Sequence, residues 1–169
     1  SPDGRQLATA GNDGFARVWD VATREELLVL PGDFSIVYSP NGEMIVTGKV
    51  DGQIVTINAQ TGEQIYELGG HPGYPWGLAF SPDMSYLATA GLRGVVKLWD
   101  VSTGEEIYTL PSQVNTVGTV AFTPDGKWLI TTGDAVRVWD VATGTELVTL
   151  APSRWAFEPT EDGRYLYAT

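Results

Sequence analysis

The chain has 169 residues, of which 43% are hydrophobic, so it can form one domain with a hydrophobic core. Cysteine is absent, which excludes a disulfide scaffold and thiolate metal sites. The formal net charge of −11 would repel a phosphate backbone. No apolar run approaches the roughly 20 residues that a membrane span requires. We therefore expect neither a nucleic acid nor a membrane as a partner.

Turn-like tetrapeptides recur along the chain at intervals of about 40 residues. Proline followed by Asp or Asn and then Gly favours a tight reversal between two strands. The copies are Ser1-Pro2-Asp3-Gly4, Ser39-Pro40-Asn41-Gly42, Ser81-Pro82-Asp83-Met84 and Thr123-Pro124-Asp125-Gly126, with a looser fifth copy at 159–163.

Each tetrapeptide is followed by the same succession of short segments. In the first copy these are a β-type run (7–10), a turn (12–14), an alternating strand that ends in Trp-Asp (15–20), a turn (22–24) and a fourth run (26–30). Later copies repeat the Trp-Asp strand at 95–100 and 136–140, and the fourth run at 106–110 and 146–150. Short, evenly spaced strands without a helical period predict an all-β fold of four-stranded antiparallel propeller blades.

Trp-Asp at the end of the third strand, Ser-Pro-Asp-Gly after the first, and Gly70-His71 before it resemble the WD-repeat β-propeller family over the whole chain. Repeat sequences such as Trp-Asp-Val-Ala-Thr-Gly-Thr-Glu-Leu, which starts at residue 139, are similar to those of bacterial members. The repeats predict 17 strands, divided as three, three groups of four, and two. The expected blade segments of this partial propeller (1–169) are 1–32, 33–70, 71–112, 113–152 and 153–169.

The resemblance also has implications for the whole ring. WD-type blades most often close as a ring of seven, so about four repeats form an arc with two open edges. We therefore expect the chain to be a segment of a larger, seven-bladed propeller. Closure by self-association and an unusually small ring are the alternatives.

Blades of this family are often pinned by a network in which a histidine before the first strand bonds an Asp in the second-to-third turn. A Ser or Thr and the Trp complete it. No blade here has the full set, because Ile57-Asn58 replaces Trp-Asp, Arg93 and Gln113 occupy an Asp and a His position, and the turn around Asp134 is short. The residues that the resemblance assigns to this structural role are Thr9, Asp13, Trp19, Thr47, Asp51, His71, Thr89, Trp99, Thr131 and Trp139.

Residues that could perform chemistry are few. His71 is the only histidine, and its place before a first strand favours a structural role over a catalytic triad. The turns 12–14 and 50–52 lack the alternating acids and the closing Glu of a calcium loop. Neighbouring carboxylates such as Glu25 and Glu26 would point to opposite faces of a strand. We expect no catalytic residue, no metal, no cofactor and no enzymatic activity.

Three tryptophans, Trp76, Trp128 and Trp155, fall outside the repeating pattern. The resemblance places Trp76 near the central opening on one rim, with Phe34 at the equivalent place in the preceding blade. Exposed aromatic side chains on a rim are typical anchors of protein interfaces. The sequence therefore predicts a partner-binding patch of Phe34, Tyr74, Trp76 and Arg93. The alternative is that shortened loops fold these rings inward.

The function implied is a non-catalytic scaffold or sensor module that binds other proteins or peptides, including other domains of its own parent chain. We expect that parent to be a multidomain signalling or regulatory protein, with the cytoplasm as the favoured compartment. One alternative is a propeller-type hydrolase or oxidoreductase whose catalytic residues lie in other blades. Another is a purely structural subunit of an assembly, which would contact its partners along the edges of the arc.

Overall fold

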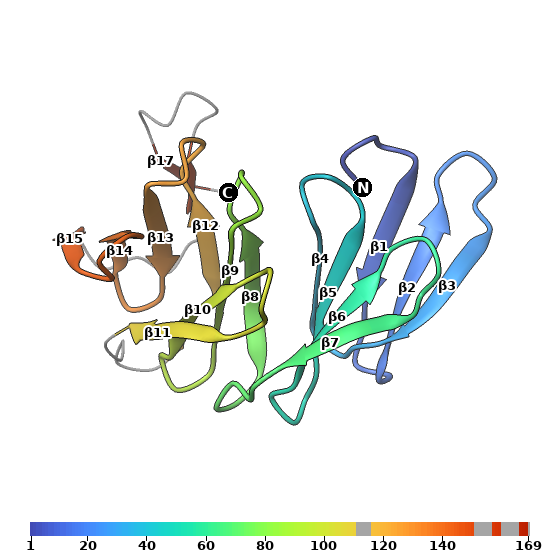
Figure 1. Cartoon of the computed structure of the whole chain (residues 1–169), viewed down its shortest axis with the longest axis horizontal. Helices are drawn as coiled ribbons and strands as arrows, with labels where there is room; N and C mark the ends of the chain where they lie inside the picture. Colours follow the sequence, from blue (N-terminus) through green and yellow to red (C-terminus); the bar gives the residue numbers. More distant parts are fainter. Residues whose placement is uncertain (111–115, 151–156, 160–165, 169) are drawn as a thin grey trace. The chain divides into compact units, whose positions relative to one another are not determined.

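The computed structural model describes residues 1–110, 116–150, 157–159 and 166–168, the last two stretches as strand backbone only. All regular structure in these residues is β, in 17 strands, which confirms the predicted fold class and strand count (Figure 1). Every strand pairs antiparallel with the next one in its sheet. The bounds are β1 (Gln6–Ala10), β2 (Phe15–Asp20), β3 (Glu26–Pro31), β4 (Ser35–Tyr38), β5 (Met44–Gly48), β6 (Ile54–Asn58), β7 (Gln64–Leu68), β8 (Pro75–Phe80), β9 (Tyr86–Gly91), β10 (Val96–Asp100), β11 (Glu106–Leu110), β12 (Thr119–Phe122), β13 (Trp128–Thr132), β14 (Val136–Asp140), β15 (Glu146–Thr149), β16 (Phe157–Pro159) and β17 (Leu166–Ala168).

These strands form one three-stranded sheet (β1–β3), three four-stranded sheets (β4–β7, β8–β11 and β12–β15) and one two-stranded sheet (β16–β17). The chain divides into two compact units, unit 1 (Ser1–Pro75) and unit 2 (Trp76–Thr169). Each unit contains two neighbouring sheets that pack against each other and have a core of their own.

The core of unit 1 lies between the sheets β1–β3 and β4–β7. Alternate residues of each strand face the neighbouring sheet, so Ala16 and Val18 of β2 pack with Ile45 of β5 and with Val55 and Ile57 of β6. All five side chains are buried. Full burial of a Val or Ile side chain contributes roughly 1.5–3 kcal/mol, so this contact between sheets is a main source of stability.

The core of unit 2 repeats this arrangement between the sheets β8–β11 and β12–β15. Val96 and Leu98 of β10 pack with Leu129 of β13 and Trp139 of β14. Gly77 in β8 allows β12 to approach closely, because a Cβ there would lie 3.3 Å from the backbone nitrogen of Val120. In both units the sheet that comes first along the chain uses its even-numbered positions in β2 or β10 for the contact.

A β-bulge recurs in the last strand of four sheets, in β3, β7, β11 and β15. The pairing register between this strand and the one before it skips one residue at the same place each time, next to Trp19, Ile57, Trp99 and Trp139. A bulge leaves the extra residue without a partner on the neighbouring strand. The skipped residues are all exposed aliphatic side chains: Leu27, Ile65, Ile107 and Leu147.

The recurring tetrapeptide builds the turn before the second strand. In the second copy the Ser39 hydroxyl donates to Asn41 Oδ1 (2.7 Å) and accepts the Met44 backbone N–H (2.9 Å). Asn41 Oδ1 also accepts the Glu43 N–H (3.1 Å). The hydroxyls and carboxylates of the other copies make the same contacts. Each turn is therefore held by two side chains of the motif itself.

Candidate functional site

The predicted partner-binding residues of unit 1 lie at one end of its sheets. Because the strands are antiparallel, the segments 11–14, 31–34, 49–53 and 69–74 all connect strands at this end, which we call the rim end. The two tetrapeptide turns of unit 1 (1–4 and 39–42) and the segments 21–25 and 59–63 lie at the opposite end. The two ends of unit 1 therefore present different loops.

Phe34 and Tyr74 meet at the rim end, although 40 residues separate them in the sequence. Their ring centroids lie 5.2 Å apart, with an interplanar angle of 56°. Phe34 is 37% exposed and Tyr74 is half-buried. Beneath them, the buried hydroxyl of Ser35 donates to the backbone oxygen of Pro75 at 2.5 Å, which joins the starts of β4 and β8. The pair is thus fixed by the strands that follow it.

Val50 is a further exposed apolar residue at the rim end, and our sequence prediction did not include it. Its side chain is 49% exposed, in the turn between β5 and β6. The Val50 backbone N–H donates to Asp33 Oδ2 (2.8 Å), and the Asp33 N–H donates to the Gly48 oxygen (3.0 Å). These bonds tie the Val50 turn to the loop that carries Phe34. The signal in the sequence was an aliphatic residue directly before Asp51-Gly52, where a turn ordinarily has polar residues.

The other two predicted residues, Trp76 and Arg93, belong to unit 2. Trp76 lies in β8 and is 41% exposed, so its ring is not folded inward. Arg93 is exposed in the turn between β9 and β10, where its φ of 70° precedes Gly94 with a φ of 69°. The structure therefore brings Phe34 and Tyr74 together. A patch of all four residues stays a prediction.

The predicted structural residues form part of the expected network. The Nε1–H of Trp19, Trp99 and Trp139 donates to the hydroxyl of a threonine on the second strand, at 3.0, 2.9 and 2.9 Å. The three acceptors are Thr9, Thr89 and Thr131.

Two of these pairs, Trp99–Thr89 and Trp139–Thr131, are buried. Trp19 is only half-buried, because no sheet in the described part of unit 1 covers its face of β1–β3. In the second sheet, which lacks the Trp, the buried Thr47 hydroxyl donates to the Pro31 oxygen instead (2.6 Å).

The turn aspartates bond within or beside their own turns, and His71 contacts the turn of the preceding sheet through its backbone. Asp13 pairs with Arg17 (2.7 Å) and Asp51 accepts the Gln53 N–H (3.0 Å), so each stabilises its own turn. His71 is buried, and its backbone N–H donates to the oxygen of Gly52 (2.8 Å). A Cβ at Gly52 would lie 2.1 Å from the His71 oxygen, so only glycine fits at this contact. Gln113 and Trp155 lie outside the described residues.

The polar residue that follows the Trp position has a role that we did not predict from the sequence. Asp100 Oδ1 accepts the backbone N–H groups of Ser102 (2.8 Å) and Thr103 (2.9 Å), and Asn58 makes the equivalent bonds in the second sheet. The Ser102 hydroxyl and these N–H groups lower the pKa of Asp100. The signal was present in the sequence, since Asn58 keeps the polar position where the Trp is replaced.

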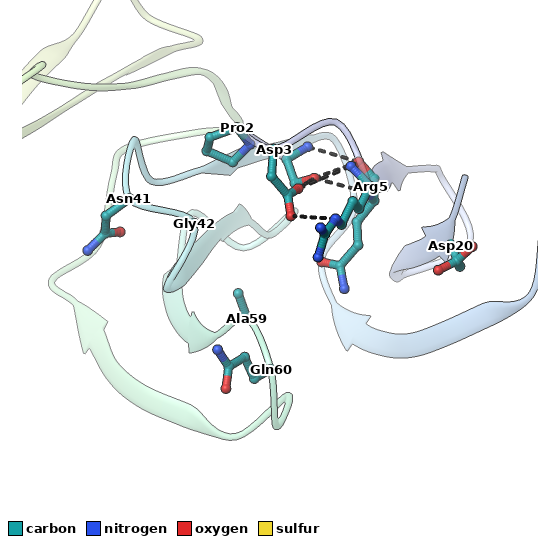
Figure 2. Close-up of a pocket in the computed structure, with 10 residues that line it drawn as sticks. Pro2, Asp3, Arg5, Asp20, Asn41, Gly42, Ala59 and Gln60 are labelled. Carbon is teal, nitrogen blue, oxygen red and sulfur yellow. Dashed lines mark hydrogen bonds and ion pairs between the residues drawn. The ribbon is translucent and has the colours of Figure 1, made fainter. Parts of the chain in front are cut away.

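A pocket of about 400 Å³ lies at the opposite end of unit 1 and is lined by residues of the turns 1–5, 39–42 and 59–63, with Gln6 of β1 and Asp20 of β2 (Figure 2). The carboxylates that line it already accept hydrogen bonds from groups of the turns. Asp3 accepts the Ser1 hydroxyl (2.6 Å) and the Arg5 N–H (3.1 Å), while Asp20 accepts the N–H groups of Ala22 and Thr23. These hydrogen bonds lower the pKa of both carboxyls. A general base at neutral pH needs a pKa near 7, so neither carboxylate fits that role.

The rest of the described chain has no competing site of the metal-binding or membrane-spanning kind. No group of three or more His, Cys, Asp or Glu side chains comes together there as metal ligands would. Among the described residues there is likewise no helix of the length and hydrophobicity needed to cross a membrane. The exposed aromatic and aliphatic residues at the rim end therefore remain the strongest candidate site.

Comparison with known proteins agrees with the repeat pattern. The WD domain, G-beta repeat, matches residues 1–20, 62–100 and 104–140, together more than half of the chain. Meiotic recombination protein rec14 of Schizosaccharomyces pombe is 39% identical over 75 residues, which cover 42% of this chain and 25% of that protein. WD repeat-containing protein 90 of Xenopus tropicalis is 33% identical over 79 residues, 44% of this chain and 4% of that protein. The chain thus spans a quarter or less of these relatives, and its likeness to bacterial repeats stays a prediction.

Proposed function

Because the chain belongs to the family of the WD domain, G-beta repeat, we propose that it is a non-catalytic module that binds other proteins. Repeat proteins of this kind offer a rigid face whose loops are free to vary. The relatives are named as a WD repeat protein and a meiotic recombination protein. In our proposal the module acts as a scaffold or sensor within a larger signalling or regulatory protein.

The observation that carries this proposal is the exposure of Phe34 and Val50 beside Tyr74 at the rim end of unit 1. Large apolar side chains on loops held in place by a sheet contribute binding area with little loss of conformational entropy. We call these three residues the rim patch. In unit 2, Trp76 and Arg93 are the corresponding candidates for contact with a partner.

We further propose that the chain forms part of a larger ring, with its blades at 1–32, 33–70, 71–112, 113–152 and 153–169. Each of the sheets β1–β3, β4–β7, β8–β11 and β12–β15 supplies one blade. A structural subunit would instead contact its neighbours along the edges of the arc, away from the rim end. The two functions therefore differ in which surface is covered.

Site-specific photocrosslinking tests the proposed function. A benzoylphenylalanine is placed at position 34 or at position 65, and the protein is irradiated in the cell from which it comes. Ile65 is the matched control, because it is an exposed aliphatic residue of unit 1 on the outer strand β7. We expect a discrete adduct with another protein, or with another domain of the parent chain, from position 34 alone. Adducts from position 65 alone would favour the structural subunit.

A further inference from the structure

We propose that the rim patch takes a short protein segment in which a bulky apolar residue is flanked by lysine or arginine. The inference rests on the proposed function and adds the chemistry of the partner. It is argued from three features of unit 1: the exposed apolar side chains, the bonds that fix them, and the charges next to them.

The rim patch offers an apolar surface of defined shape. Phe34 and Tyr74 meet at a tilt of 56°, so their two rings do not lie flat against each other. Val50 is held near them through the bond from its N–H to Asp33. A surface fixed in this way before binding loses little entropy when a partner docks. An aliphatic or aromatic side chain is the group that such a surface fits.

The charges at the rim patch are predominantly negative. Asp33 precedes Phe34 and Asp51 follows Val50, so each of these two exposed apolar residues has a carboxylate as its neighbour in the sequence. The bond from the Val50 N–H orients Asp33 but does not neutralise it. Asp51 is exposed. Lys49 is the nearest cation along the chain; its ammonium donates to the neutral Gln53 Oε1 (2.6 Å) and keeps its charge, so two carboxylates stand against one ammonium.

The turn 11–14 at the rim end carries Asp13, and the nearest cation to it along the chain is Arg17 of β2. Arg17 is engaged by Asp13 (2.7 Å) and Glu26 (3.4 Å), so this cation is surrounded by carboxylates. The whole chain carries a net charge of −11. An acidic segment would be repelled on approach, whereas lysine or arginine beside the apolar anchor would be attracted. Charge complementarity thus specifies a basic partner segment.

Selection from a display library of random short peptides against the intact chain tests this inference. We expect the enriched peptides to carry Leu, Ile, Phe or Trp next to Lys or Arg. The affinity of one enriched peptide is then measured by fluorescence anisotropy. Rising salt should weaken it several-fold, since the attraction at an exposed surface is screened over about 10 Å at 0.1 M salt.

Three variants locate the binding. Phe34→Ser should lower the affinity for the peptide about tenfold or more, as the loss of an interface anchor does. Asp51→Lys should also weaken it and should reduce the dependence on salt. Ile65→Ser should bind as the wild type does. Phe34→Leu should restore most of the affinity, which separates a lost anchor from a misfolded loop.

Enrichment of neutral or acidic peptides would overturn the inference, as would an Asp51→Lys variant that binds a basic peptide unchanged. So would the absence of any enriched peptide. In each case the crosslink from position 34 decides separately about the proposed function. If that crosslink forms, the partner is a protein of different chemistry, and if it does not form, both proposals fail.

Discussion

At the scale of single residues, the four tetrapeptide turns differ in one informative place. Gly4, Gly42 and Gly126 have φ angles of 70°, 74° and 71°, and the third copy has Met84 with a φ of 66°. Glycine adopts this left-handed region readily, whereas a residue with a Cβ adopts it at a cost of about 1–2 kcal/mol. Met84 therefore holds a conformation that the other copies assign to glycine.

Replacing this residue, Met84→Gly, should stabilise the protein. The backbone strain is relieved, and part of the gain is lost to the greater freedom of glycine in the unfolded chain. We expect the free energy of unfolding to rise by about 0.5–1 kcal/mol, measured by urea denaturation. The reverse change Gly126→Met is the matched control and should lower it. A Met84→Gly variant that is less stable than the wild type would contradict the assignment of strain.

At the scale of strands, a hydrogen bond from a Trp to a Thr links two neighbouring strands in three sheets: β2 to β1, β10 to β9 and β14 to β13. The pair in β10 and β9 is buried, and the pair in β2 and β1 is largely exposed. A buried N–H that loses its acceptor retains the full desolvation penalty, whereas water replaces the acceptor at an exposed site. The bond should therefore contribute more to the free energy of unfolding in the sheet β8–β11 than in the sheet β1–β3.

The comparison of Thr89→Val with Thr9→Val measures this difference. Thr89→Val leaves the buried Trp99 Nε1–H without its acceptor, and we expect a loss of about 1–3 kcal/mol in the free energy of unfolding. Thr9→Val should change it by less than about 0.5 kcal/mol. Urea denaturation followed by tryptophan fluorescence gives both values. Equal losses in the two variants would show that burial does not set the contribution of this bond.

Acid sensitivity is also argued at the scale of strands, because carboxylates hold the turns that join them. Bonds from the Ser102 hydroxyl and the Thr103 N–H lower the pKa of Asp100 in the folded state below its ordinary value. Stabilisation by a carboxylate with a lowered pKa is complete above the unfolded pKa and is lost as pH falls through the folded one.

An Asp100→Asn variant should therefore lose less stability than the wild type when the pH falls below about 4. Asn58 shows that an amide oxygen accepts the same two N–H bonds in the second sheet, so the turn itself is kept. Urea denaturation at a series of acidic pH values gives the two curves. Parallel curves for the variant and the wild type would count against this account of the turn.

The strand pattern was predictable from the sequence, because turn residues and alternating apolar residues recur in phase. The predicted run 26–30 and the observed β3 differ by one residue. The bulges at Leu27, Ile65, Ile107 and Leu147 were not predictable, since a skipped residue depends on pairing between strands and not on residue type. The turn-capping role of Asp100 was missed because the Trp-Asp pair was considered only for its Trp.

At the scale of the whole molecule, two units each pair two sheets through one apolar core. Phe34 and Tyr74 meet because the segments that carry them lie at the same end of unit 1, whereas the repeat phase equated Phe34 with Trp76 and not with Tyr74. Val50 was not predicted, because the bond that holds its turn, from Val50 to Asp33, joins segments 17 residues apart. Loops of this kind are positioned by tertiary contacts that periodicity does not encode.

The central claim is that the chain binds another protein through the rim patch. Calorimetry tests it most directly. The partner that crosslinking identifies is titrated into the wild type, into Phe34→Ser and into Ile65→Ser. We expect Phe34→Ser to bind the partner about tenfold more weakly or worse, and Ile65→Ser to bind it with unchanged affinity. Wild-type affinity in Phe34→Ser, or a loss confined to Ile65→Ser, would contradict it.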